Sequence, residues 1–117
     1  MNVKPGRKTS EIIERDGKTI GLPLKIRFYP IVGEDAEGVI ITDPDGFEYL
    51  DFLSGWCVTN IGYSHPAVLE AVKKQIEKTL FLPLCSVSNE VVVKLAEKLI
   101  EITPGSFDKR VWFGLSG

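Results

Sequence analysis

The sequence predicts an α/β fold in an α+β arrangement, with a β-hairpin, two amphipathic helices and one short buried strand along 117 residues. Three observations predict it. Two β-prone runs flank an Asp-Pro-Asp-Gly turn, apolar residues recur at helical spacing in two later segments, and an apolar run near residue 112 is followed by glycine. The length suits one domain, and 44% hydrophobic with 26% charged residues is typical of a soluble globular protein.

The amino-terminal segment has no sustained period. Ile12 and Ile13 stand isolated between charged residues, and Gly17, Gly21 and Pro23 interrupt any helical pattern. We therefore predict an extended or partly mobile arm over residues 1–27.

The hairpin is predicted over residues 39–52. The run Val39–Thr42 and the run Phe47–Phe52 are rich in β-branched and aromatic residues. Between them, Pro44 presets its φ angle and Gly46 tolerates a positive one, and both properties favour a tight turn. Asp43 and Asp45 are interpreted as turn formers rather than acid/base groups. Residues 53–66, with small and large residues alternating, are predicted to form a structured loop.

Two amphipathic helices follow. The first begins at Pro66, with Ser64 or His65 as its cap, and runs to about Thr79. The second begins near Ser88 or Asn89 and ends before Thr103. Its apolar positions recur on one face that we expect to be buried: Val91, Val92, Leu95, Ala96, Leu99 and Ile100.

The apolar run Val111–Phe113 is predicted to be a buried strand, followed by a glycine turn over residues 114–117. Such a strand is typical of the start of a parallel sheet, and a parallel strand without a neighbour leaves its backbone unpaired. We therefore expect the chain to be an amino-terminal piece of a larger protein, or to pair with something that completes its sheet.

Charge and motifs exclude several functions. The formal net charge is −2, from 14 basic and 16 acidic residues, which argues against nucleic-acid or membrane partners. The charge is uneven: residues 1–27 hold seven basic and three acidic residues (net +4), and residues 28–72 hold eight acidic and no basic ones (net −8). These blocks indicate solvated faces or a basic arm over an acidic body.

Nothing in the sequence predicts a metal site or a secreted protein. Cys57 and Cys85, 28 positions apart with His65 between them, do not have metal-ligand spacing. No apolar run is long enough to span a bilayer and no secretory segment begins the chain, so we expect a cytoplasmic protein with reduced thiols. The common nucleotide, zinc and hydrolase motifs do not occur.

The order of motifs from Tyr29 to Gly117 closely resembles the class III, fold type I, pyridoxal-phosphate-dependent aminotransferases. The parts that carry the resemblance are Asp43-x-Asp45-Gly46-x-Glu48-Tyr49-x-Asp51-Phe52-x-Ser54-Gly55, then Asn60-Ile61-Gly62-Tyr63-Ser64-His65-Pro66, then Leu95-Ala96-Glu97-Lys98-Leu99, and Val111-Trp112-Phe113-Gly114-Leu115-Ser116-Gly117. Each is weak alone and the ordered series is specific. Tyr63 departs from the His that many relatives carry.

The resemblance implies an enzyme that moves an amino group from an amine or amino acid, such as a 4-aminobutyrate-like or ornithine-like donor, to a 2-oxo acid. The implied cofactor is pyridoxal 5'-phosphate (PLP), and the implied assembly is a homodimer. It also implies that residues 28–87 form part of a small domain and that residues 88–117 enter a large PLP-binding domain. In relatives a downstream lysine forms the Schiff base with the cofactor, and none of the ten lysines here is nominated for that role, so the chain alone is expected to be inactive.

The resemblance nominates three site residues. Ser116 and Gly117 precede the helix whose amino-terminal N–H groups hold the cofactor phosphate in relatives. Trp56 falls where relatives place a substrate-lining side chain, although packing in the core is an equal alternative. For Cys57 we favour a small buried residue, and for His65 a helix cap.

Two rival functions stay open at this point. A PLP-dependent amino acid racemase on the same scaffold is the enzymatic alternative. A non-enzymatic α+β assembly module is the other, because the chain lacks the Schiff-base lysine.

Overall fold

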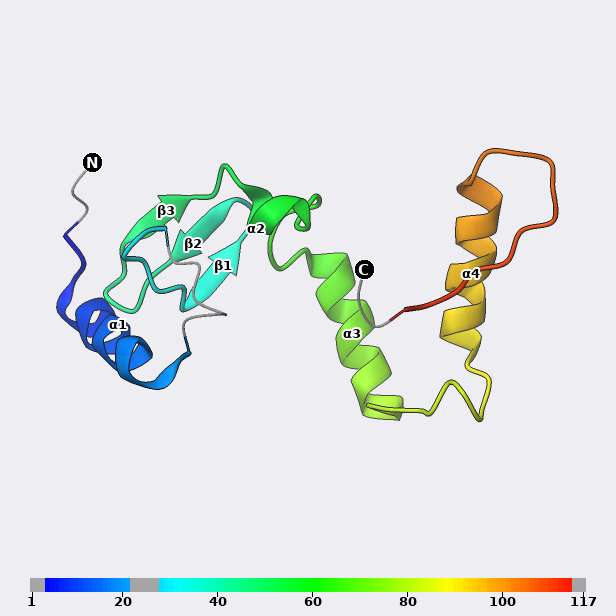
Figure 1. Cartoon of the computed structure of the whole chain (residues 1–117), viewed down its shortest axis with the longest axis horizontal. Helices are drawn as coiled ribbons and strands as arrows, with labels where there is room; N and C mark the ends of the chain where they lie inside the picture. The colour runs from blue at the N-terminus through cyan, green and yellow to red at the C-terminus, as the bar shows by residue number, and fades with distance from the viewer. Residues whose placement is uncertain (1–3, 22–27, 115–117) are drawn as a thin grey trace. The chain divides into compact units, whose positions relative to one another are not determined.

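The computed structural model describes residues 4–21 and 28–114. Along this part of the chain the elements are α1 (Arg7–Thr19), β1 (Asp35–Glu37), β2 (Ile40–Thr42), β3 (Glu48–Leu50), α2 (Ser54–Cys57), α3 (Pro66–Lys78) and α4 (Glu90–Ile102) (Figure 1). The backbone contacts divide the chain into two units, residues 1–73 and 74–117. The three-part division at residues 27 and 87 stays a prediction.

The three strands form one antiparallel sheet in the order β1-β2-β3. Ile41 is the central residue of the register, opposite Ala36 on β1 and Tyr49 on β3. The β2–β3 pair confirms the predicted hairpin. Asp43 shapes its turn, because the side-chain Oδ1 accepts hydrogen bonds from the backbone N–H groups of Asp45 and Phe47, both at 2.9 Å.

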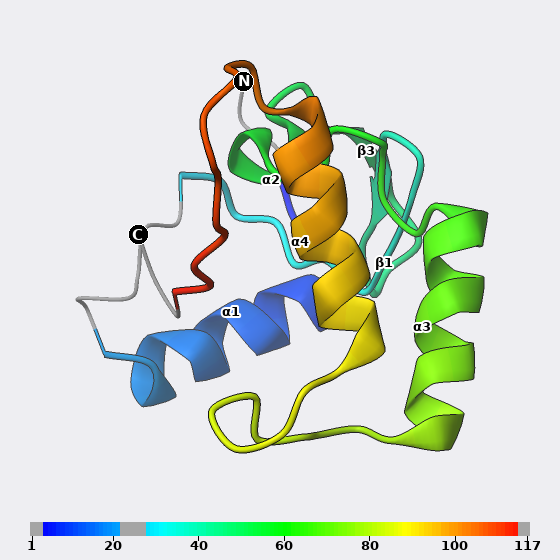
Figure 2. The ribbon, with the colours of Figure 1, turned by 90° about the vertical axis from the view of Figure 1, so that its right-hand side faces the viewer.

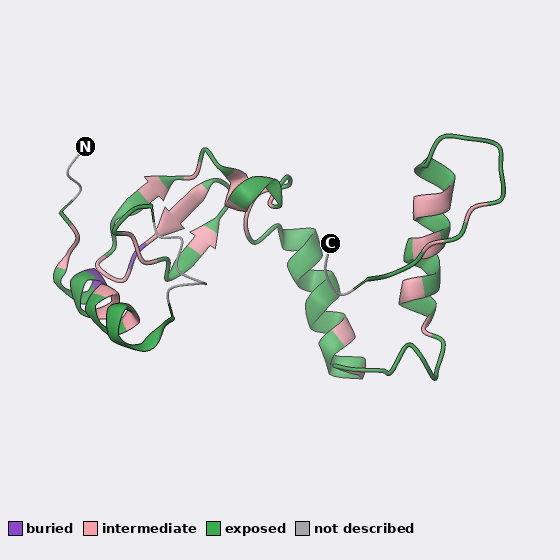
Figure 3. Cartoon of the chain, viewed as in Figure 1, coloured by how far each residue is buried: buried purple, intermediate pink, exposed green. Residues whose placement is uncertain are grey.

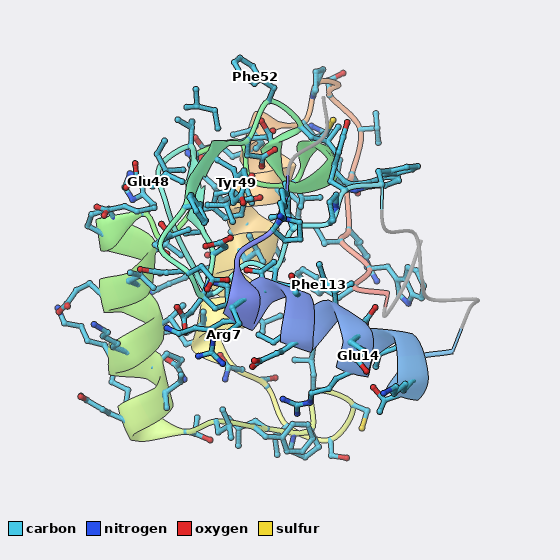
Figure 4. All side chains as sticks on the ribbon, turned by 90° about the vertical axis from the view of Figure 1, so that its left-hand side faces the viewer. Arg7, Glu14, Glu48, Tyr49, Phe52 and Phe113 are labelled. Atoms are coloured by element: carbon cyan, nitrogen blue, oxygen red, sulfur yellow. The ribbon has the colours of Figure 1, made fainter. Side chains whose placement is uncertain are left out.

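The predicted extended arm is wrong for residues 7–19, which form the helix α1. Its charged residues pair at helical spacing, with Arg7 and Glu11 2.8 Å apart and Lys18 and Glu14 2.6 Å apart. Such pairs stabilise a helix by about 0.2–0.5 kcal/mol each. Figure 4 shows the labelled Arg7 and Glu14 on this helix.

The main support of α1 comes from the hairpin turn. The N-cap residue, Gly6, contributes no side-chain hydrogen bond. Instead the Asp45 carboxylate accepts hydrogen bonds from the N–H groups of Lys8 at 3.1 Å and Thr9 at 2.8 Å. A carboxylate placed there also interacts favourably with the helix dipole. The cap therefore lies 36 residues away from the helix it completes, and that is why local patterns miss α1.

Both later helices confirm their predictions, and Figure 2 shows them as regular helices. Of the two predicted caps of α3, Ser64 and His65, it is His65 that caps the helix, because its Nδ1 accepts a hydrogen bond from the Ala67 N–H at 3.3 Å. At the start of α4, the Asn89 side chain accepts one from the Val91 N–H at 2.8 Å.

The expected burial of the α4 face is wrong in the described part of the chain. Val91 is 56% exposed and Leu95 is 50% exposed, and the remaining positions of that face are half-buried. In the described segments the buried residues are Thr9 and Asp43, and no apolar side chain is buried (Figure 3). Phe52, which is 93% exposed, stands away from the ribbon (Figure 4). A soluble protein normally buries such side chains, so these surfaces have the character of an unfilled core.

The predicted strand at Val111–Phe113 is also wrong. These residues have no strand assignment and Trp112 is 86% exposed. The physical reason is that a strand needs a partner for its backbone groups, and the sheet formed by β1, β2 and β3 does not include this segment. Of the predicted glycine turn at residues 114–117, residues 115–117 lie outside the described residues.

Candidate functional site

Trp56 lies on α2, and α2 is a left-handed turn. The φ angles are 51° at Ser54, 56° at Gly55, 63° at Trp56 and 64° at Cys57. Left-handed backbone costs an L-residue other than glycine about 1–2 kcal/mol. Strain of this kind persists only where the surrounding structure enforces it, and it concentrates at functional sites.

The Asp51 carboxylate enforces the start of this turn. Its Oδ1 accepts a hydrogen bond from the Leu53 N–H at 2.7 Å, and its Oδ2 accepts one from the Gly55 N–H at 2.8 Å. The same Oδ2 accepts a third from the Tyr63 hydroxyl at 2.7 Å. One side chain therefore binds the backbone on both sides of Ser54 and a tyrosine 12 residues further along.

Gly55 is required by the close approach of Tyr63 as well as by its positive φ. A Cβ built at this position would lie 3.2 Å from the Tyr63 hydroxyl oxygen and 3.0 Å from the Thr59 Cγ2 atom. The absence of a side chain lets the tyrosine reach the carboxylate over the turn.

Tyr63 is itself fixed to the sheet. Its N–H donates to the Gly38 carbonyl at 2.8 Å and its carbonyl accepts from the Gly38 N–H at 3.0 Å, which forms an isolated antiparallel bridge. Next to it, the Ser64 hydroxyl donates to the Ala36 carbonyl at 2.6 Å. A Cβ on Gly62 would lie 2.9 Å from the Gly38 carbonyl oxygen, so this contact also depends on a glycine. The sheet is thus connected to α2 through Tyr63 and Asp51.

The electrostatics agree with this geometry. Hydrogen bonds from the Tyr63 hydroxyl and from the Gly55 and Leu53 N–H groups lower the pKa of Asp51. The same bond to Asp51 raises the pKa of Tyr63, because it favours the protonated hydroxyl. At neutral pH the pair is therefore a carboxylate and a neutral donor, which is the combination the contact needs.

The turn presents Trp56 on the surface. The indole is 62% exposed and stacks on Phe28, with ring centroids 6.0 Å apart and an interplanar angle of 21°. Trp56 is not packed in a core in the described segments, and both its substrate-lining role and its packing in the completed protein stay predictions. The interpretation of Cys57 as a buried residue is wrong, because the left-handed turn exposes it. Both cysteines are free.

An open groove of about 660 Å³ adjoins the turn, because Asp51 and Leu53 contribute to its wall. The rest of its lining in the described segments is mainly apolar and aromatic and comes from the strand region and from residues 29 and 31: Tyr29, Ile31, Ile41, Glu48, Tyr49, Leu50 and Phe52. A second open groove, of about 640 Å³, lies between α1 and residues 28–33. Phe28, the stacking partner of Trp56, is part of that second lining.

Comparison with known proteins decides the family. The sequence profile described as "Aminotransferase class-III" matches residues 25–117. The chain belongs to the class III aminotransferase family. Members of this family are PLP-dependent enzymes, so the expected family, fold type and cofactor class are confirmed.

Two curated relatives and one solved structure illustrate this membership. The chain is 36% identical to the alanine/serine racemase of Pyrococcus horikoshii, over 97% of this chain and 24% of that protein. It is 40% identical to the probable 4-aminobutyrate aminotransferase of Bacillus subtilis, over 69% of this chain and 19% of that protein. The crystal structure of the acetylornithine aminotransferase of Elizabethkingia anophelis is 28% identical with a TM-score of 0.72, covering 83% of this chain and 24% of that one. The chain thus spans about a fifth to a quarter of the length of these proteins.

The starts of the three long helices are capped within the chain. Each long helix begins with first-turn N–H groups bonded to residues of this chain: Asp45 at α1, His65 at α3 and Asn89 at α4. The nominated cofactor-binding residues, Ser116 and Gly117, lie outside the described residues. Their role in holding the cofactor phosphate stays a prediction.

His65 has a structural role, because it caps α3 as predicted.

In residues 4–21 and 28–114, no group of three His, Cys, Asp or Glu side chains is placed to hold a metal ion. No helix in these segments is long and apolar enough to cross a membrane.

The class III motif includes Asp51 and Tyr63, but the sequence alone predicts no role for either residue. One local signal was available for Asp51, because an Asp side chain often accepts from the N–H two residues on, as it does here from Leu53. No local signal indicates the bond from Tyr63, which depends on the antiparallel bridge to Gly38.

Proposed function

We propose that this chain is the amino-terminal part of a PLP-dependent aminotransferase, called here the full-length protein. It transfers an amino group from an amine or amino acid donor to a 2-oxo acid. The observation that carries the proposal is the class III profile match over residues 25–117. The coverage of 24% of one relative and 19% of the other supports a longer functional chain.

The burial pattern supports the same proposal. In the described segments no apolar side chain is buried, and exposed aromatic residues such as Phe52 and Trp112 present surface that a completed protein would cover. We expect the 117-residue chain alone to be inactive, because no lysine in it is assigned to the cofactor. The full-length protein is proposed to be a cytoplasmic homodimer that acts on small molecules.

Trp56 is the proposed substrate-lining residue. Its exposed indole is held against Phe28 on a strained turn, and an exposed aromatic face of this kind can sort substrates by size. Ser116 and Gly117 are proposed to hold the cofactor phosphate, as their motif position implies. When bound, PLP supplies an electron sink for the substrate carbon.

For the donor we propose a molecule with a distal amine, similar to 4-aminobutyrate or ornithine. Support comes from the names of two relatives, the Bacillus 4-aminobutyrate enzyme and the Elizabethkingia acetylornithine enzyme. The acceptor is proposed to be a 2-oxo acid.

A second function has a specific observation in its favour. The alanine/serine racemase of Pyrococcus horikoshii aligns over almost the whole chain, whereas the Bacillus aminotransferase aligns over about two thirds. The alternative is therefore an amino acid racemase, which inverts one carbon and requires no acceptor.

One experiment separates the two functions. The full-length protein, loaded with PLP, is incubated with 4-aminobutyrate or ornithine and 2-oxoglutarate, and separately with L-alanine or L-serine without any 2-oxo acid. Chiral chromatography then measures new glutamate in the first case and D-amino acid in the second. Glutamate formed only when a donor is present supports the aminotransferase. If D-amino acid forms without an acceptor and no glutamate forms, the protein is a racemase and not an aminotransferase.

A further inference from the structure

The strained turn at Trp56 is bound by two neighbouring side chains, those of Asp51 and Tyr63. Three residues other than glycine adopt positive φ in this turn, and nothing in their own chemistry favours that backbone. The turn has backbone hydrogen bonds of its own, from the Cys57 N–H to the Leu53 carbonyl and from the Val58 and Thr59 N–H groups to the Ser54 carbonyl. The side chains that bind it come from outside: the Asp51 carboxylate accepts from the Leu53 and Gly55 N–H groups, and the Tyr63 hydroxyl donates to the same carboxylate.

Asp51 and Tyr63 are each fixed to the sheet region by backbone hydrogen bonds. Asp51 directly follows β3, and its N–H donates to the Val39 carbonyl at 2.9 Å. Tyr63 is bridged to Gly38 by two backbone hydrogen bonds. Because both residues are tied to the same part of the sheet, the hydroxyl and the carboxylate meet at a fixed place, and the turn between them has little freedom to relax.

The turn determines where the indole lies. A relaxed, right-handed backbone at Trp56 would send its Cβ in another direction, and the parallel stack on Phe28 would be lost. The side chain is 62% exposed and its ring contact in the described segments is the stack on Phe28, so other packing in these segments does little to fix the indole. The backbone conformation must therefore supply the orientation.

We propose that Asp51 and Tyr63 are positioning residues, which hold the left-handed turn and so fix the Trp56 indole as a substrate-selecting wall. This inference rests on the proposed substrate-lining role of Trp56. It adds the two side chains that fix the orientation of the indole. Neither Asp51 nor Tyr63 needs to touch the substrate. The selection they exert acts through Trp56 alone.

The chain offers a matched control for this device. The Tyr49 hydroxyl donates to the Asp43 carboxylate at 3.1 Å, which is the same type of contact in the same unit. Asp43 is bound to the hairpin turn and to Thr9, not to α2. Tyr49→Phe therefore removes the same hydroxyl and the same charged acceptor bond without acting on Trp56.

The first test measures donor selectivity in the full-length protein, as the ratio of kcat/KM for a small donor to kcat/KM for a bulky one. Tyr63→Phe should change this ratio by roughly tenfold or more, the scale expected for losing a hydrogen bond to a charged group. Trp56→Ala should change it as well, and adding Tyr63→Phe to Trp56→Ala should change it no further. Tyr49→Phe should leave it within twofold. Additive effects of Tyr63→Phe and Trp56→Ala would overturn the proposal.

The second test is structural and does not depend on activity. A crystal structure of the Tyr63→Phe full-length protein should show at least one of residues 54–57 outside the left-handed region, with Trp56 no longer stacked on Phe28. An unchanged turn and stack would overturn the positioning role even if selectivity changed. Failure of the proposed function has a different signature, which is wild-type protein that forms no amino-transfer product while the turn still depends on Tyr63.

Discussion

Thr9 and Asp43 are buried and hydrogen-bonded to each other, with 3.0 Å between the Thr9 Oγ1 and the Asp43 Oδ2. One residue lies in the first turn of α1 and the other in the hairpin turn, 34 positions later. The contact shows that the amino-terminal helix is a docked part of the sheet region. It also makes α1 the clearest place to test the architecture by substitution.

Thr9→Val should loosen α1. Valine keeps the shape of threonine but removes the hydroxyl, so the Asp43 carboxylate loses one of its hydrogen-bond donors. Hydrogen exchange of the peptide containing residues 7–19, measured in the full-length protein, should become several-fold faster. Thr19→Val is the matched control, because Thr19 is exposed on the same helix. Equal exchange in both variants would contradict the docking role of Thr9.

Gly6→Ala should weaken the same junction by a different route. A Cβ at residue 6 would overlap the carboxyl carbon of Asp45, which caps α1 through the Lys8 and Thr9 N–H groups. The carboxylate must then move, so exchange in residues 7–19 should rise. At the control position, Gly33→Ala, the added Cβ would lie 3.4 Å from the Ile41 Cγ2, an ordinary contact, and exchange should stay near wild type.

α1 could not be predicted from the sequence, unlike the hairpin, α3 and α4. The hairpin, α3 and α4 carry local signals, namely the Asp-Pro-Asp-Gly turn, the Pro66 start and the Asn89 cap, and all three were predicted. α1 has a glycine inside it and no cap of its own, and Asp45 reaches it only after the chain has folded back. A tertiary cap of this kind leaves no local pattern.

The site was predicted in part for the same reason. The family motif located Trp56, but the handedness of its turn depends on Tyr63 reaching Asp51 across 12 residues. The failed strand at Val111–Phe113 is the opposite case. Its apolar pattern predicts a strand, but a strand forms only against a partner, and the sheet of the described residues does not include this segment.

The α1 cap should depend on pH. The hydrogen bond from the Thr9 N–H, together with that from Lys8, lowers the pKa of Asp45. A group with a lowered folded-state pKa contributes stability above its ordinary pKa of about 3.9, and this is lost as pH falls through the lowered value. The melting temperatures of wild type and Asp45→Asn should therefore differ most near neutral pH and converge in acid below about pH 4. A difference that stays constant from pH 7 to pH 3 would show that the charge of Asp45 is unimportant.

The isolated 117-residue chain should self-associate. Its apolar surface includes Trp112, which is 86% exposed, and the adjacent Phe113. Exposed apolar surface of this kind promotes association. Sedimentation velocity should show oligomers, and Trp112→Ser with Phe113→Ser should shift the distribution toward monomer. A monodisperse monomer without these substitutions would argue against the incomplete core.

Nitrogen tracing distinguishes amino transfer from racemisation in the full-length protein. The full-length protein with PLP is supplied with 15N-labelled 4-aminobutyrate or ornithine and unlabelled 2-oxoglutarate, and the glutamate formed is analysed by mass spectrometry. We expect glutamate that carries the 15N label in proportion to the donor consumed. Unlabelled glutamate, or no glutamate while L-alanine is racemised, would contradict it.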